Sequence, residues 1–217
     1  MKERPIIFSS PMVRAILDGR KTQTRRIVKK QISDIHKFQG WIIGSTDKKR
    51  DGCASWGVVR CPYGKPGDRL WVRETWQGPL FYDEIPEDWN SDKYKTPEYC
   101  YYKASGDSCD FTDSDDNFVE RWSPSIHMPR SASRISLEIT GVRVERLQDI
   151  SAEDAKAEGV ECWRNAEIFK GLEVCSLYRY EFEDLWKHLN GKGSWDLNPW
   201  VWVIEFMVLN NERDIKS

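Results

Sequence analysis

Residues 19–26 read GRKTQTRR, and the residues before this octapeptide decide where it lies in the fold. Ser10 and Pro11 suit the N-cap and the first position of a helix. The apolar residues whose spacing would form one face of that helix are Met12, Val13, Ile16 and Leu17. Gly19 suits the left-handed residue that ends a helix. The octapeptide is therefore expected to begin where a short helix ends.

The rest of the chain predicts strands separated by short helices. The expected strands are 69–76, 135–144 with a bulge at Gly141, and the continuously apolar 200–209. The expected helices are 152–158, with a capping box at its start, and about 176–189, with Phe182, Leu185, Trp186 and Leu189 on one face. Residues 28–63 are expected to be loop with short strands, 65–68 a turn and 124–134 an extended loop. This pattern predicts an α+β fold, with a small closed β-barrel surrounded by short helices.

The chain of 217 residues is expected to form a single domain, 1–217, with an acidic insertion at 77–123. Residues 1–30 hold nine Lys and Arg against two acidic residues, whereas residues 79–120 hold three Lys against twelve acidic residues. Such asymmetry can focus an anionic ligand at one place. The insertion could be a solvated flap, an electrostatic gate or a partner site. Trp76 and Trp122 bracket it and could belong to the core or line a groove.

The six cysteines are scattered, with no CxxC pair, so free thiols are the default interpretation. No signal-like or membrane-spanning apolar run is visible, so a cytoplasmic location without membrane partners is expected. No metal site and no cofactor are expected, and the oligomeric state is left open.

Within the octapeptide, Lys21 and Thr24 could form a reactive pair. A threonine hydroxyl needs an adjacent base, and a lysine can be that base if burial or nearby cations lower its pKa. Arg20, Arg25 and Arg26 supply such cations. A spacing of three brings the two side chains together on a turn and separates them on a flat strand. The alternative is a basic surface stretch that binds phosphate or only water.

Three segments together resemble the ASCH family, whose fold is a PUA-like β-barrel linked to RNA. They are LDGRKTQTRR at 17–26, PGDRLWVRE at 66–74, and the late helix followed by a strand ending in VIEF at 203–206. The chain is similar to the longer branch of that family found in phages and prophages, in which an IHMPR-type loop also occurs. The resemblance covers 5–30, 64–76 and 124–209 and leaves out the acidic segment.

The resemblance implies an activity and a set of catalytic residues. Small bacterial members are amidohydrolases that remove the acyl group from N4-acetylcytidine through a Lys, a Thr and a Glu. Lys21 and Thr24 match the first two. Glu158 in SAEDAKAEGV is the best match for the third, and Glu153 is its main competitor. The expected substrate is an N4-acylated cytosine nucleoside, although a shared fold does not fix the substrate.

Other residues are expected to contact a modified nucleoside or RNA. The candidates are Arg20, Arg26, Arg73, Glu74, His127 and Arg130. Arg26 could stabilise an oxyanion, and the loop that carries His127 could clamp a phosphate, cap the pocket, or be an ordinary surface loop. The alternatives to an amidohydrolase are a noncatalytic RNA-binding module, whose affinity would fall steeply with salt, and a metal-independent ribonuclease.

Overall fold

The computed structural model describes residues 1–29, 35–38, 41–48, 54–80, 87–88, 91–106, 110–112, 118–161 and 174–209. The contacts divide the chain into two compact units. The first unit comprises Met1–Leu17, Arg69–Glu138 and Val208–Ser217, and the second comprises Asp18–Asp68 and Ile139–Met207. Among the described residues, no helix has the length and apolarity that crossing a membrane requires.

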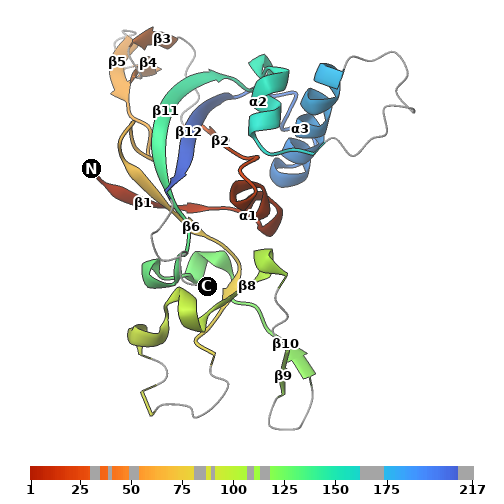
Figure 1. Ribbon diagram of the computed structural model, residues 1–217. Coiled ribbons are helices and arrows are strands. Elements are labelled where there is room, and N and C mark those ends of the chain that lie inside the picture. The colour runs from red at the N-terminus through yellow and green to blue at the C-terminus, as the bar shows by residue number, and fades with distance from the viewer. Residues whose placement is uncertain are drawn as a thin grey trace. The chain divides into compact units, whose positions relative to one another are not determined.

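The described residues form a mixed α+β fold, as the sequence predicted, and its main sheet has five strands (Figure 1). The strands follow the order β1-β6-β11-β12-β2 and are β1 Glu3–Ile7, β6 Arg69–Arg73, β11 Ser136–Arg146, β12 Trp200–Leu209 and β2 Gln23–Ile27. β1 runs parallel to β6, whereas β6 with β11 and β12 with β2 form antiparallel pairs. The strand pairs of the described residues close no barrel.

The strand β12 shows why the sequence folds in this way. Its apolar side chains point to both faces of the sheet, and residues 201–204 are all buried, so both faces are covered here. β11 continues through Gly141 as one strand. A Cβ added at Gly141 would overlap the carboxylate of Glu205, so this side chain approaches the backbone of β11 closely at the glycine.

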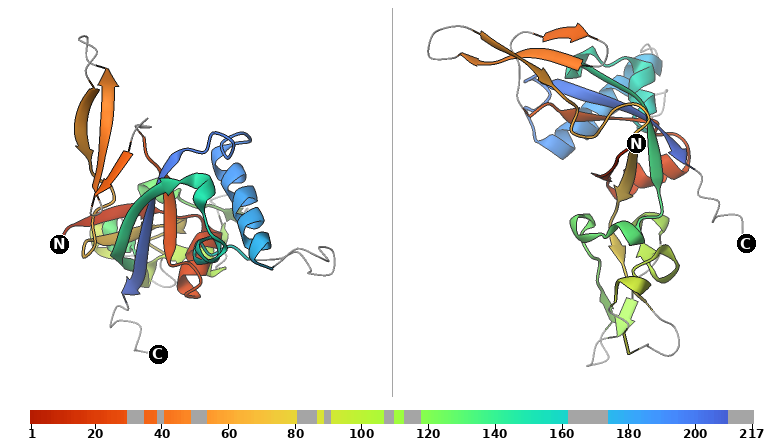
Figure 2. Two further views of the ribbon diagram at one scale, coloured as in Figure 1. Left: turned by 90° about the horizontal axis from the view of Figure 1, so that it is seen from above. Right: turned by 90° about the vertical axis from the view of Figure 1, so that its left-hand side faces the viewer.

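The second unit also contains two helices and a smaller sheet. The helices are α2 Ala152–Ala157 and α3 Val174–Asn190, and Figure 2 shows α3 alongside the strands of this unit. Ser151 caps α2 by accepting a hydrogen bond from Asp154 N at 3.1 Å, as the sequence predicted. The smaller antiparallel sheet comprises β3 Ile35–Phe38, β4 Trp41–Lys48 and β5 Ala54–Val59, which lie where loop with short strands was expected.

The core of the second unit joins both helices to the sheet. Its buried residues are Leu147, Ile150, Ala155, Phe182, Trp186, Trp195, Val201 and Val203. Phe182 and Trp186 confirm the predicted apolar face of α3, whereas Leu189, expected on the same face, is half exposed.

The first unit has α1 Ser10–Leu17, which ends before Gly19 at φ 72° and packs against the 3-10 turn Lys103–Ser105. The helix buries Val13 and Ile16 as predicted, but Leu17 is half exposed. The short strand pairs are β7 Trp76–Gln77 with β8 Tyr101–Tyr102, and β9 Asp110–Thr112 with β10 Phe118–Glu120. Further 3-10 turns lie at Asp92–Tyr94 and Pro97–Tyr99, and the second unit has one at Leu147–Asp149.

Two predictions about the first unit need correction or refinement. Residues 124–134 were expected to be an extended loop, but they contain the 3-10 turns Ser125–His127 and Arg130–Ala132. Each turn directly follows a proline, whose fixed φ suits the start of a helical turn. Trp76 is buried in a core cluster with Cys100, Tyr102, Met128 and Ala132, so it does not line a groove.

Candidate functional site

The second unit brings Lys21 and Glu158 together at the start of β2. Lys21 and Glu158 form an antiparallel β-bridge, and the next residue, Thr22, donates its N–H to Ala157 O at 2.9 Å. Glu158 is the C-cap of α2, and Gly159 follows at φ 82°. The left-handed glycine ends the helix and lets the chain turn beside Lys21. Residues 137 positions apart in sequence thus become neighbours.

The side chains of this pair are buried and in direct contact. Lys21 Nζ donates to Glu158 Oε2 and to Glu158 O, both at 2.8 Å, and the side chains are 0% and 4% exposed. Burial lowers the pKa of Lys21; the ion pair with Glu158 acts in the opposite direction, and the charges of Arg26 and Arg25 lower the pKa further. This is the electrostatic condition that a lysine base requires.

The competing carboxylate, Glu153, lies elsewhere on α2. It is exposed in the first turn of that helix, whereas Glu158 is buried against Lys21. Of the two carboxylates that the sequence left as alternatives, Glu158 is therefore the one that the structure places on Lys21.

Arg25 holds the other oxygen of the same carboxylate. One terminal nitrogen of its guanidinium group donates to Glu158 Oε1 at 3.0 Å. The other terminal nitrogen donates to Asp154 Oδ2 at 2.8 Å and to Glu145 Oε1. The Arg25 side chain is 0% exposed. Lys21 and Arg25 thus hold Glu158 from its two oxygens.

Further charged groups surround Arg25. Arg143 donates to both oxygens of Asp154 at 2.9 and 2.8 Å, to Glu145 at 3.2 Å and to Glu205. Burial alone would raise the pKa of Asp154, but the hydrogen bond from Arg143 and the charges of Arg25 and Arg143 bring it below its ordinary value. Sequence reasoning missed this network. The available signals were the spacing of two between Arg143 and Glu145 on a strand, and of four between Asp154 and Glu158 on a helix.

Thr24 lies on β2 and is buried. Its backbone is in register with Ile204 of β12, and it is 3% exposed. Arg26 lies two positions further along β2 and is partly buried; burial lowers the pKa of Arg26, while nearby Tyr63 and Glu158 raise it. Gln23 donates from its side chain to Asp154 O at 2.9 Å. Gln23, Thr24 and Arg25 are therefore buried in the unit, whereas Thr22 is exposed.

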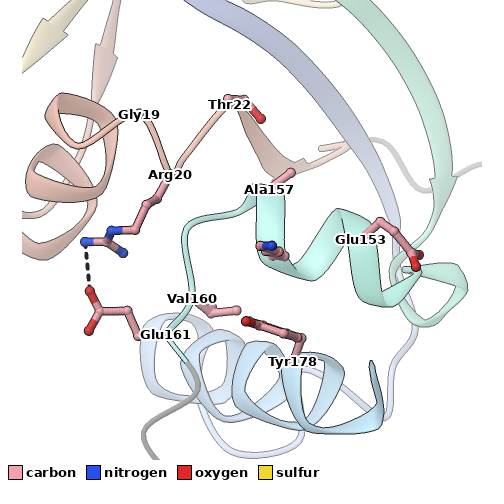
Figure 3. Close-up of a pocket in the computed structure, with 9 residues that line it drawn as sticks. Gly19, Arg20, Thr22, Glu153, Ala157, Val160, Glu161 and Tyr178 are labelled. Atoms are coloured by element: carbon pink, nitrogen blue, oxygen red, sulfur yellow. Dashed lines mark ion pairs between the residues drawn. The ribbon is translucent and has the colours of Figure 1, made fainter. Parts of the chain in front are cut away.

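A pocket of about 620 Å³ adjoins the Lys21–Glu158 bridge (Figure 3). Its lining residues are Gly19, Arg20, Thr22, Glu153, Lys156, Ala157, Val160, Glu161 and Tyr178. Arg20 is 37% exposed and forms ion pairs with Asp18 and Glu161, each at 2.8 Å. Lys21, Thr24 and Glu158 do not line this pocket, so it does not by itself give a substrate access to them.

Two further candidates, Arg73 and Glu74, belong to the first unit. Arg73 donates to Met128 O at 3.0 Å, and its guanidinium lies 4.9 Å from the centre of the Trp71 ring. Glu74 is 1% exposed and accepts two hydrogen bonds from Arg134, at 2.9 and 3.0 Å. These contacts hold β6 to the segment that contains Met128 and Arg134.

The loop candidates His127 and Arg130 also belong to the first unit. His127 is exposed at the end of a 3-10 turn. Arg130 forms a two-bonded ion pair with Glu3, at 2.9 and 2.7 Å, with both side chains well exposed. The structure therefore gives Arg130 an intramolecular carboxylate, where the sequence suggested a phosphate.

Comparisons with protein-family models, with curated proteins and with solved structures find no match to this chain. The resemblance to the ASCH family thus rests on the sequence segments that carry it.

Proposed function

We propose that this chain is an amidohydrolase that removes the acyl group from an N4-acylated cytosine nucleoside, with N4-acetylcytidine as the first candidate. The observation that carries the proposal is the buried contact between Lys21 and Glu158, with Lys21 Nζ 2.8 Å from Glu158 Oε2. A lysine whose pKa is lowered by burial is a suitable general base for a threonine nucleophile.

In the proposed reaction, neutral Lys21 takes the proton of the Thr24 hydroxyl, and Thr24 Oγ1 attacks the acyl carbonyl carbon. The tetrahedral intermediate collapses, the bond from carbon to N4 breaks, and the ammonium of Lys21 protonates the leaving amine. Water, deprotonated by Lys21, then attacks the acyl-threonine ester. The bond from the acyl carbon to Thr24 Oγ1 breaks, the ammonium of Lys21 returns the proton to Oγ1, and the released carboxylic acid gives its proton to solvent. Glu158 orients Lys21 and stabilises its ammonium form between these steps.

Two requirements follow from the geometry. A developing oxyanion needs donors, and Arg26, two positions after Thr24 and on the same face of β2, is the proposed cation for this purpose. Thr24 is only 3% exposed, and on extended backbone it projects to the face opposite Lys21, Gln23 and Arg25, which contact α2. The proposed reaction therefore requires a local rearrangement around β2 that brings Thr24 to Lys21 and admits the acyl group.

We further propose that the fold is a PUA-like barrel of the ASCH type, with the single domain 1–217 and the acidic insertion 77–123. Two segments of the sequence resemblance support this, because they pair in the sheet: Gln23 and Thr24 of GRKTQTRR are in register with Glu205 and Ile204 of VIEF. An experimental structure in which β1 and β2 belong to unconnected sheets would contradict the barrel.

The main alternative, an RNA-binding module, makes a different use of the basic stretch. Binding to phosphates requires exposed cations that are available to the ligand. Lys21 and Arg25 are instead buried in ion pairs with Glu158, Glu145 and Asp154, and Arg20 pairs with Glu161. These contacts favour the hydrolase, because a phosphate could reach the two buried cations only by breaking buried pairs.

The test is hydrolysis of N4-acetylcytidine, followed by its ultraviolet spectrum, with the variants Lys21→Met and Thr24→Val. Both variants are expected to lose at least about a thousandfold in kcat/KM while remaining folded by circular dichroism. Thr140→Val, at an exposed position of β11, is the control and should keep the wild-type rate.

An RNA gel shift at two salt concentrations completes the experiment. Wild-type protein that hydrolyses no acylated cytosine compound but binds RNA, with affinity that falls steeply with salt, would replace the hydrolase by the binding module. Metal-independent cleavage of RNA would replace it by the nuclease.

A further inference from the structure

The guanidinium group of Arg25 occupies an unusual place for a strand residue with no exposed surface. It is surrounded by Glu158 from the end of α2, Asp154 from the first turn of α2, and Glu145 from β11. Its central carbon lies 5.8 Å from the centre of the Phe182 ring of α3. An arginine presents its donors in a rigid planar fork, so these partners fix the orientation of the group.

Arg25 and Lys21 bind different oxygens of the Glu158 carboxylate. Lys21 binds Oε2 and Arg25 binds Oε1, at 2.8 and 3.0 Å. If Lys21 gives up its proton to act as a base, its share of the positive charge at this carboxylate disappears. The Arg25 guanidinium still binds Oε1, so Glu158 keeps a cationic partner throughout the cycle.

We propose that Arg25 is a positioning residue for the hydrolysis: it holds the Glu158 carboxylate in the orientation that receives Lys21 Nζ and supplies the charge that lets Lys21 act in its neutral form. This inference rests on the proposed function. It goes beyond it because it assigns a role to a residue that does not contact the reacting atoms.

The groups around Arg25 support this role. Asp154 and Glu145 are themselves held by Arg143, which also contacts Glu205 of β12. The carboxylates that orient Arg25 are thus fixed by a second arginine. The pKa of Lys21 is lowered first by burial and additionally by the charges of Arg26 and Arg25, while Glu158 raises it, which agrees with the proposed effect of Arg25.

The experiment compares the pH profiles of kcat/KM for wild type, Arg25→Lys and Arg25→Met with N4-acetylcytidine as substrate. Arg179→Met is the matched control, because Arg179 is an exposed residue of α3 that donates to Gln148 O. In parallel, the ionisation of Lys21 Nζ is followed by NMR of 13C-labelled lysine, with the signal assigned by its absence from Lys21→Met.

In Arg25→Met, kcat/KM is expected to fall at least tenfold, and the acidic limb of the profile should move to higher pH by about one unit. Arg25→Lys retains the charge and should keep the limb near the wild-type position at a reduced rate. Arg179→Met should match wild type in both respects. An acidic limb that stays in place in Arg25→Met would reduce Arg25 to a structural residue and overturn the proposal.

Two difficulties are covered by the design. If Arg25→Met does not fold, the double variant Arg25→Met/Glu145→Gln, which removes one of the carboxylates left without a partner, is titrated in its place. If wild type hydrolyses no substrate, the proposed function fails, and the NMR titration then tests only whether Arg25 lowers the pKa of Lys21. An unchanged Lys21 titration in the arginine variants then contradicts the positioning role as well.

Discussion

Replacing Glu158 by glutamine removes one negative charge and almost no volume from the buried pair. The carboxylate accepts from Lys21 at 2.8 Å and from Arg25 at 3.0 Å, and its side chain is 4% exposed. Removing one partner of a buried ion pair costs about 3–5 kcal/mol, since the remaining charge is left uncompensated. The glutamine oxygen can still accept from one of the two cations, so we expect the lower end, about 3 kcal/mol.

This loss of unfolding free energy should appear in thermal and in urea unfolding. For a chain of this length, about 3 kcal/mol corresponds to a decrease in Tm of about 6–12 °C. The matched control is Glu153→Gln, the same exchange on the same helix at an exposed position. Because the control loses only a favourable contact with the helix dipole, its cost should stay below about 1 kcal/mol.

The stability comparison also tests the assignment of the catalytic carboxylate. Glu158→Gln should lose hydrolysis of N4-acetylcytidine in the fraction that remains folded. If it unfolds with the same midpoint as Glu153→Gln, the buried pair does not exist as described. If folded Glu158→Gln hydrolyses at the wild-type rate, the role given to Glu158 is wrong.

Three further predictions follow from other groups. The pKa of Lys21 is lowered in the folded protein, so the neutral form of Lys21 is reached below the ordinary pH range of lysine. The value of kcat/KM should therefore rise with pH along a limb that begins below about pH 10. A kcat/KM that falls with pH over this range would contradict a lysine base. Arg134→Met removes the bidentate partner of the buried Glu74 and should lower the free energy of unfolding in urea by about 3 kcal/mol. Arg130→Met removes one partner of an exposed ion pair and should lower it by less than about 1 kcal/mol. Equal losses would show that burial does not distinguish the two pairs. Burial raises the pKa of the Cys100 thiol to about 12. Iodoacetamide at pH 8 should therefore label Cys100 at least about a hundredfold more slowly than free cysteine, as measured by peptide mass spectrometry. Labelling at the rate of free cysteine would show that the thiol is exposed.

The elements that sequence alone predicted correctly carry local signals. Ser151 and Gly159 mark the two ends of α2, and the turn before β6 has Gly67 at φ 84° with Asp68 N donating to Lys65 O at 2.9 Å. A cap or a left-handed glycine acts within four residues, so no knowledge of the tertiary structure is needed.

The failures lie where tertiary contacts decide. Leu17 and Leu189 share the apolar spacing of their helices and each lies in the last turn, yet both are half exposed, whereas Ile16 beside Leu17 is buried. Spacing tells which face of a helix is apolar. It does not tell how far along the helix its neighbour extends.

In the candidate site, too, local features could be predicted from the sequence, whereas tertiary contacts could not. That Lys21 and Thr24 could react was visible from residue types, but the contact of Lys21 with a carboxylate 137 positions away came only from the family resemblance. Arg25 was visible as a cation and not as the residue that binds Glu158. Its three carboxylate partners lie on β11 and α2, and only the folded sheet brings these elements to β2.

The charge of the octapeptide has a consequence for the kind of ligand that suits it. The excess of basic residues in 1–30 suggested a field that attracts anions, but Lys21 and Arg25 are neutralised at short range by Glu158, Asp154 and Glu145. Binding a phosphate there would replace buried, well-oriented carboxylates by a ligand that must itself lose its hydration, which is unfavourable by several kcal/mol. An acylated cytosine base carries no charge, so its binding would not compete with these carboxylates for Lys21 and Arg25. The same network that weakens the case for RNA binding therefore favours a neutral substrate.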